Sequence, residues 1–169
     1  IKAWKIVKSK NNSQNIKLVI MGVDFGFQDE MLKMVKQMDI SNEIIIIKKP
    51  PREDIFMAYK ACMFLVLPSR WELSPLTPLE GFAFKKTSIS TTAHGIPYTL
   101  SDKENAILVE PENYNQLANE IYNLIKNSNL RNDLGNNGFK LIQEECNSEK
   151  MAEKILKVYE KVFNFKKMK

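Results

Sequence analysis

Short, uninterrupted apolar runs alternate along this chain with segments whose apolar residues recur at helical spacing. The stretch from Asn42 to Lys48 holds four consecutive isoleucines, a β-branched pattern typical of a strand buried on both faces. Five such runs occur, at residues 17–21, 42–48, 63–67, 88–92 and 106–110. Helical spacing appears before and between them, at residues 2–9, 27–38, 53–61 and 75–85. Strands that alternate with helices pair in parallel through right-handed crossovers, so the pattern predicts an α/β fold with a doubly wound sheet in three α/β/α layers.

The last third of the chain has no strand pattern and is expected to be helical. Three helices are predicted, around residues 117–125, 130–146 and 149–165. Gly135 and Gly138 lower the helix propensity of the second one. The third carries a wide apolar face made by Met151, Ile155, Val158, Tyr159 and Val162. No internal repeat or linker is visible, so residues 1–169 are treated as one domain.

Composition narrows the class of protein. With 44% hydrophobic and 27% charged residues in 169, the chain has enough apolar mass for one core. No apolar run approaches the roughly 18 residues of a membrane span. The two cysteines, Cys62 and Cys146, form neither a disulfide framework nor a metal spacing, which favours a reducing compartment and hence the cytoplasm.

The net charge of +5 suits phosphate-bearing ligands or an anionic membrane surface. A peripheral contact at the inner membrane face is therefore one expectation, and an ordinary solvated lysine-rich surface is the other. No basic stripe interleaved with aromatic residues occurs, which argues against a nucleic-acid partner.

The segment after the third predicted strand carries two carboxylates separated by seven residues, Glu72 and Glu80. Ser74 is expected to cap the following helix, with Pro75 at its first helical position. In doubly wound sheets, ligands bind at the carboxyl ends of the strands near helix N-termini. The two acids can frame a ligand there, with the free N–H groups and dipole of the helix facing a diphosphate. The alternative interpretation is two surface acids near a helix start.

Read in order, the chain resembles the retaining glycosyltransferases of family 4. The matching pieces are KLVIMG, a strand with a basic loop, AYKACMFLVLPS, the Glu72-x7-Glu80 spacing, HGIP and the segment NAILVEP. The resemblance covers nearly the whole chain and implies a Rossmann-like domain, the C-terminal half of the two-domain GT-B fold, which binds the nucleotide-sugar donor. It also implies that a first strand with a basic Arg and Lys pair, and an N-terminal acceptor domain as partner, precede residue 1 in a longer parent chain.

The resemblance assigns roles around the acidic pair. Glu80 would hold the ribose hydroxyls of the nucleotide, and Glu72, counted as the catalytic residue, would contact the transferred sugar. The backbone N–H groups of Ser74, Leu76 and Thr77 would receive the diphosphate.

The outer contacts follow from other matching pieces. Lys49 to Arg52 would lie along the nucleobase, and Gly22 with Gly26 matches a turn after the preceding strand. His94 and Gly95 would contact the donor sugar or the diphosphate, although an inert loop histidine is an equal interpretation of the only histidine.

Several residues depart from the family pattern. Pro75 replaces a usual glycine and removes one N–H, and Tyr98 replaces a usual acid after HGIP. The family's Gly and Pro after the second Glu become Lys85 and Thr87. No Asp-x-Asp metal motif occurs, so we expect a site that needs neither a metal nor a cofactor.

Two classes of function follow. The first is a retaining, metal-independent hexosyltransferase, inactive as this isolated stretch because the acceptor domain is absent from it. The alternative is a nucleotide-sugar-binding subunit without transfer activity, which the altered HGIPY and Lys85-Lys86-Thr87 stretches favour. A nucleotide-sugar epimerase or a flavodoxin-like binding domain on the same fold is less favoured. The apolar face of the last helix, if uncovered, predicts self-association.

Overall fold

A computed structural model of the chain describes residues 1–10 and 15–167. The helices are α1 (Lys2–Lys10), α2 (Gln28–Gln37), α3 (Arg52–Ala61), α4 (Leu76–Ala83), α5 (Tyr114–Lys126), α6 (Ser128–Glu144) and α7 (Ser148–Lys167). The strands are β1 (Leu18–Gly22), β2 (Ile44–Lys48), β3 (Leu65–Leu67), β4 (Ser88–Thr91) and β5 (Ile107–Val109), with short 3₁₀ turns at Ser41–Glu43 and Ile96–Tyr98. The predicted elements are all present, with ends that differ by up to three residues.

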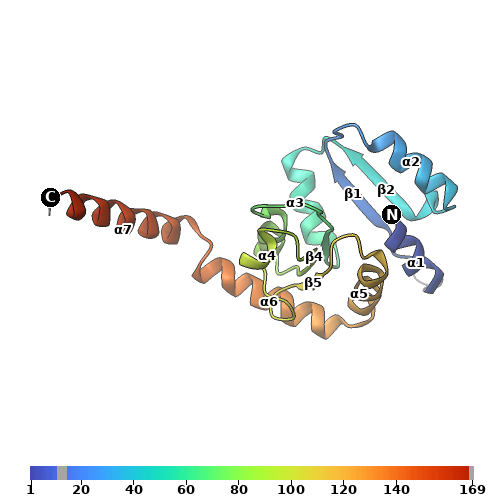
Figure 1. The fold of residues 1–169 in the computed structure, drawn as a ribbon. Coiled ribbons are helices and arrows are strands. Elements are labelled where there is room, and N and C mark those ends of the chain that lie inside the picture. The colour runs from blue at the N-terminus through green and yellow to red at the C-terminus, as the bar shows by residue number, and fades with distance from the viewer. Residues whose placement is uncertain (11–14, 168–169) are drawn as a thin grey trace.

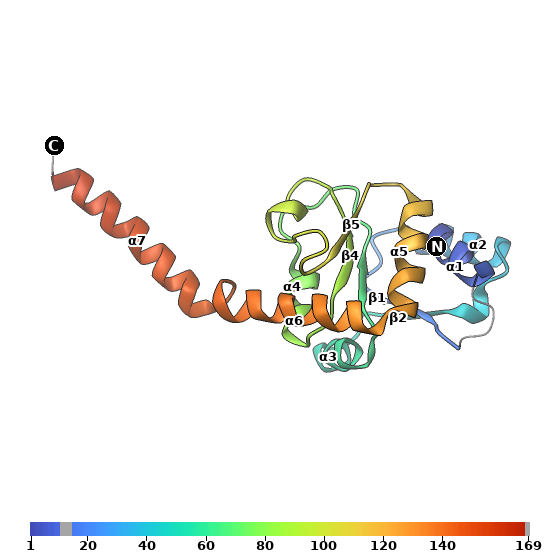
Figure 2. The ribbon, with the colours of Figure 1, turned by 90° about the horizontal axis from the view of Figure 1, so that it is seen from below.

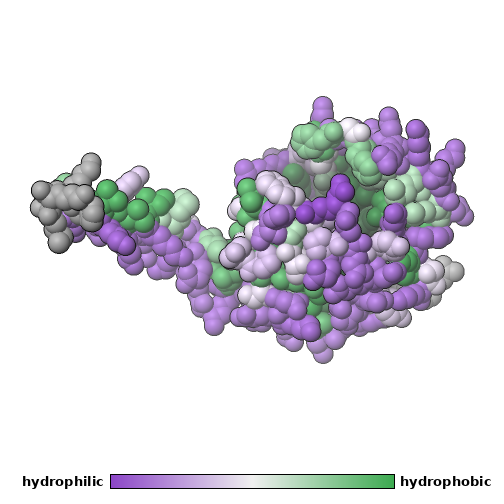
Figure 3. Space-filling view, viewed as in Figure 1, coloured by the Kyte–Doolittle hydropathy of each residue, from purple (hydrophilic) through white to green (hydrophobic). Residues whose placement is uncertain are grey.

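The strands form two parallel sheets rather than one continuous sheet. β1 pairs with β2, and β3, β4 and β5 pair in that order. The α/β, Rossmann-like fold class is confirmed, since parallel strands are joined by helices (Figure 1). The difference is that β1 and β3 do not pair with each other, so each leaves one edge open. Figure 3 shows a hollow lined by hydrophobic residues between the two halves.

One apolar core nevertheless joins the two sheets. Its buried residues come from α1, α2, β4, β5, α5 and α6, and Leu18 of β1 and Val66 of β3 pack against it. A second, smaller cluster lies under α4, with Phe82, Ile96 and Leu100 fully buried. The two sheets therefore share a hydrophobic core even though no ladder connects them.

α4 and α6 pack closely because α6 carries glycines at the contact. A Cβ on Gly138 would lie 2.2 Å from the Phe82 ring, and one on Gly135 would lie 2.2 Å from the Lys85 carbonyl oxygen. α6 runs without a break through both positions. The glycines therefore permit the close approach at a cost in helix propensity.

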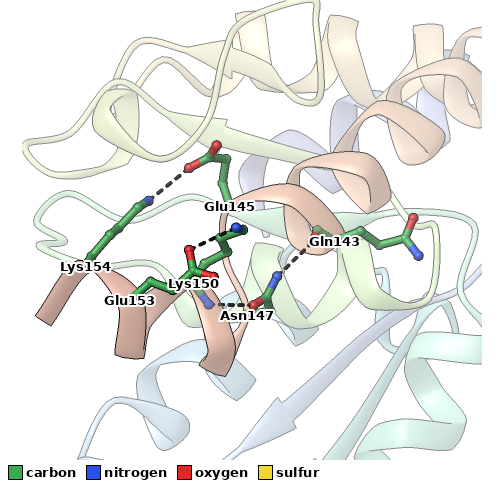
Figure 4. Close-up of polar contacts among 6 residues, drawn as sticks. All are labelled: Gln143, Glu145, Asn147, Lys150, Glu153 and Lys154. Atoms are coloured by element: carbon green, nitrogen blue, oxygen red, sulfur yellow. Dashed lines mark hydrogen bonds and ion pairs between the residues drawn. The ribbon is translucent and has the colours of Figure 1, made fainter. Parts of the chain in front are cut away.

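α7 projects from the body as a single helix (Figures 1 and 2). At its start, Asn147 accepts the backbone N–H of Lys150 and donates to the Gln143 carbonyl at the end of α6 (Figure 4). Lys154 pairs with Glu145 across the junction at 2.9 Å. In the part of the chain that the structure describes, no helix has the length and apolar character to cross a bilayer.

Candidate functional site

The start of α4 lies at the carboxyl end of β3. Helix α4 begins at Leu76, and the residue before it is Pro75, whose ψ of 97° is extended. The expectation that Ser74 caps the helix with Pro75 inside it was therefore wrong by one residue. Among the residues that the structure describes, no side chain makes a capping hydrogen bond at α4. The N–H groups of Leu76 and Thr77 occupy the first turn, where helix geometry supplies no intrahelical acceptor.

Glu72 is folded back on its own loop. Its Oε1 accepts the backbone N–H groups of Leu73 at 3.0 Å and Ser74 at 3.1 Å. The Ser74 N–H, which sequence reasoning assigned to a diphosphate, is thus bonded to Glu72 in this structure. The carboxylate and the start of α4 are nevertheless adjacent, as the spacing predicted.

The His94-Gly95 loop packs directly on the Glu72 loop. The Gly95 N–H donates to the Glu72 carbonyl at 2.8 Å. A Cβ on Gly95 would lie 1.8 Å from the Leu73 carbonyl oxygen, so the loops approach this closely only because residue 95 is glycine. The His94 ring lies 6.0 Å from the Trp71 ring, and both side chains are exposed to solvent. The structure therefore brings Glu72, His94 and Gly95 together.

Glu80 has a partner that sequence reasoning missed. The Tyr59 hydroxyl of α3 donates to Glu80 Oε2 at 2.6 Å. Tyr59 is buried, and burial, together with the Glu80 carboxylate, raises the pKa of Tyr59 far above its ordinary value. In the sequence, Tyr59 is one of the apolar residues on a predicted helix face. No local pattern distinguishes a tyrosine that contacts Glu80 from one that only fills the core.

Gly22 and Lys49 meet at the carboxyl end of the other sheet. The Lys49 N–H donates to the Gly22 carbonyl at 2.9 Å. Arg52 begins α3, with its guanidinium 5.3 Å from the centre of the Phe56 ring. No hydrogen bond or ion pair among the described residues links these basic groups to Glu72 or Glu80.

The turn after β1 is closed by a side chain of its own. Asp24 Oδ1 accepts the N–H groups of Gly26, Phe27 and Gln28, and these bonds hold the pKa of Asp24 below its ordinary value. Gly26 has a φ of 101°, as the predicted turn requires. Asp24 therefore already occupies the start of α2, whereas no side chain in the described part of the chain caps the start of α4.

These features define a class of protein: a Rossmann-like α/β domain with an uncapped helix start, one acid, Glu72, in the loop before that helix and a second, Glu80, within it. The sequence model of the family described as "Glycosyl transferases group 1" matches residues 1–141. The chain therefore belongs to that family. An uncharacterized glycosyltransferase of Methanocaldococcus jannaschii is 31% identical over 150 residues, which cover 85% of this chain and 42% of that protein. The chain thus spans about two fifths of that curated relative.

Solved structures agree with the family and the fold. The C-terminal domain of a glycosyl transferase group 1 family protein, LpcC, from Francisella tularensis is 30% identical with a TM-score of 0.77, covering 87% of this chain and 77% of that one. HepE of Anabaena, solved in complex with UDP-glucose, has a TM-score of 0.80 at 16% identity, covering 94% of this chain and 44% of that one. The predicted match to the C-terminal half of a GT-B glycosyltransferase is confirmed at the level of family and fold.

Proposed function

We propose that this chain is the donor-binding domain of a retaining, metal-independent glycosyltransferase. It binds a nucleoside diphosphate sugar, whose hexosyl group passes to an acceptor held by an N-terminal domain of the same parent protein. The cytoplasm, with a peripheral contact at the inner membrane face, is the proposed location. UDP-glucose bound to HepE, a protein of the same fold, supports this class of donor.

The observation that carries the proposal is the uncapped start of α4 between Glu72 and Glu80. The N–H groups of Leu76 and Thr77 and the positive end of the helix dipole suit a diphosphate. Three large apolar side chains around this point, Trp71, Leu73 and Leu76, are each about two thirds exposed, at 64%, 64% and 65%. An exposed apolar rim of this kind fits a surface that a ligand or a second domain covers.

Each acid has a separate proposed role. Glu80, facing the nucleotide, accepts ribose hydroxyls. Glu72 exchanges its two backbone bonds for hydroxyls of the donor sugar, which releases the Ser74 N–H to the diphosphate. His94 and Gly95, already packed on the Glu72 loop, border the same sugar.

The nucleobase occupies the outer part of this proposed site. Lys49 and Arg52 would lie along it, with Gly22 allowing close approach at the end of β1. Each of these residues lies at or just after the carboxyl end of a strand, the edge at which doubly wound sheets bind nucleotides.

The proposed chemistry depends on stabilising the departing diphosphate. Negative charge grows on the leaving group as the sugar becomes oxocarbenium-like, and donors already aimed at it lower the barrier most. The helix start supplies such donors from this chain, and the basic pair of the parent protein would supply the rest. The acceptor hydroxyl attacks from the face that the diphosphate leaves, so the departing phosphate can take its proton.

Calorimetry with UDP, GDP and ADP tests the proposal. We expect at least one to bind weakly, with the same affinity in the presence of EDTA, and no sugar transfer by this chain alone. Binding that strictly requires Mg²⁺ would contradict the metal-independent site. Robust turnover without an added acceptor domain would contradict the proposal that a separate domain holds the acceptor. If none of UDP, GDP and ADP binds, the proposed donor-binding role is wrong.

A further inference from the structure

Tyr59 of α3 contacts the proposed nucleotide site through Glu80 of α4. Its ring is buried, with 6% of its surface exposed, while Glu80, which it contacts, is an exposed residue. The hydroxyl donates to Glu80 Oε2 at 2.6 Å. An exposed glutamate on a helix ordinarily samples several rotamers, and a short bond to a buried donor selects one of them.

The Tyr59 ring is itself held in place. It stacks on the Phe84 ring, with 5.7 Å between the ring centroids and an angle of 22° between the ring planes. The Phe84 and Phe56 ring centroids are 6.0 Å apart. Arg52 lies over the far side of this row, against Phe56. The aromatic row, Phe56, Phe84 and Tyr59, therefore connects the residue proposed to face the base with the residue proposed to face the ribose.

The surroundings of Tyr59 keep its hydroxyl protonated. Burial and the Glu80 carboxylate raise the pKa of Tyr59, and the Thr77 side chain lowers it by less. The net pKa lies far above its ordinary value, so the hydroxyl keeps its proton at neutral pH.

We propose that Tyr59 is a positioning residue of the nucleotide site: its hydroxyl orients the Glu80 carboxylate so that Oε1 meets a ribose hydroxyl. This inference rests on the proposed function, in which Glu80 binds ribose. It adds a specific requirement, namely that discrimination between ribose and deoxyribose depends on a residue of α3 that does not touch the ligand.

The test measures affinity for a ribonucleotide and its 2′-deoxy form, using whichever pair binds: UDP and dUDP, GDP and dGDP, or ADP and dADP. We expect the wild-type chain to prefer the ribonucleotide by about tenfold, as one charge-assisted hydrogen bond allows. Tyr59→Phe keeps the ring stack and removes only the hydroxyl, and should reduce the preference to within about twofold. Tyr122→Phe on α5 is the matched control and should leave the preference unchanged.

Affinity for inorganic pyrophosphate separates positioning from a general loss of structure. Pyrophosphate carries no ribose, so Tyr59→Phe should bind it like the wild-type chain. Equal weakening of pyrophosphate and nucleotide would overturn the proposal, because it would indicate a disturbed helix start rather than a misplaced carboxylate.

Glu80→Gln distinguishes failure of this inference from failure of the proposed function. If Glu80→Gln abolishes the ribose preference and Tyr59→Phe retains it, Tyr59 has no positioning role. If Glu80→Gln also retains the preference, or if no nucleotide binds, the proposed role of Glu80 is wrong and this inference falls with it. Should Tyr59→Phe fail to fold, NMR of the wild-type chain decides. The Tyr59 Cζ signal must shift with the ribonucleotide and not with pyrophosphate, and any other pattern overturns the proposal.

Discussion

Glu72 and Glu80 are the same residue type in the Glu-x7-Glu spacing, but their side chains have different surroundings in the structure. Glu72 Oε1 is bonded to two backbone N–H groups of its own loop, and Glu80 Oε2 is bonded to a buried tyrosine. A carboxylate held by its own loop can exchange those bonds for a ligand, whereas one held from the core keeps its orientation. This contrast supports a sugar-facing role for Glu72 and a nucleotide-facing role for Glu80.

Substitution of each acid should separate the two roles. Glu80→Gln removes a charge-assisted acceptor from ribose and should weaken binding of the free nucleoside diphosphate by about 1–3 kcal/mol. Glu72→Gln should hardly change that affinity, because its proposed partner is the sugar, but should lower turnover in the full-length enzyme. Calorimetry with both variants checks this, and equal weakening of UDP or GDP binding would show that the division of roles is wrong.

At the residue scale, sequence reasoning found the loop residues but not the side chain beneath them. Glu72, Glu80, His94 and Gly95 stand in recognisable spacing, and the structure brings Glu72, His94 and Gly95 together. Tyr59 lies 21 residues before Glu80 on another helix. Its role depends on how α3 packs against α4, which no local pattern encodes.

At the scale of elements, the apolar runs predicted every strand, but they did not predict which strands pair. A parallel strand reads as the same apolar run whether one or both of its edges are hydrogen-bonded. The sequence therefore does not predict the open edges of β1 and β3, which only the structure shows. We propose that the strand which the family resemblance places before residue 1 pairs between them and completes the sheet. The expected burial of an apolar strand on both faces was wrong for β1 and β2, because Val19 and Ile45 are each 46% exposed.

The glycines of α6 were predicted to weaken that helix, and the structure adds a packing reason for their presence. Gly138→Ala would place a methyl group 2.2 Å from the fully buried Phe82 ring. Overpacking of this kind costs about 1–3 kcal/mol, and the gain in helix propensity offsets roughly 1 kcal/mol of it. We expect a net loss of up to about 2 kcal/mol in the free energy of unfolding, measured by urea denaturation.

The matched control is Asn136→Ala, on the exposed face of the same helix. It gains helix propensity without meeting Phe82 and should be neutral or slightly stabilising. If Gly138→Ala proves as stable as Asn136→Ala, the close approach of α4 and α6 is not a constraint on the fold.

At the scale of the whole molecule, the main feature is that α7 packs on no other element of the described chain over most of its length (Figure 2). Its exposed apolar residues include Met151, Ile155, Val158 and Val162, at 60%, 44%, 59% and 53% exposure. Their spacing of four, three and four residues is that of a helix seam which pairs with another helix or surface. We propose that this seam packs on the acceptor domain of the parent protein.

Without that domain, we expect the isolated chain to self-associate through α7. Removal of the residues beyond Lys157 deletes Val158 and Val162 and should restore a monomer, because the remaining seam is too short to pair. Light scattering on both proteins measures this. The full chain remaining monomeric at high concentration with an intact α7 would contradict the expectation, as would continued association after truncation.

The central claim is that a nucleoside diphosphate binds at the uncapped start of α4. Backbone amide NMR during titration with the nucleotide that binds in calorimetry tests it most directly, because each N–H reports its own environment. The account predicts the largest shifts at Leu76, Thr77 and Gly95, with little change at Lys150 in the α6–α7 junction. Shifts centred on Gly26, in the turn before α2, with Leu76 and Thr77 unmoved, would contradict it.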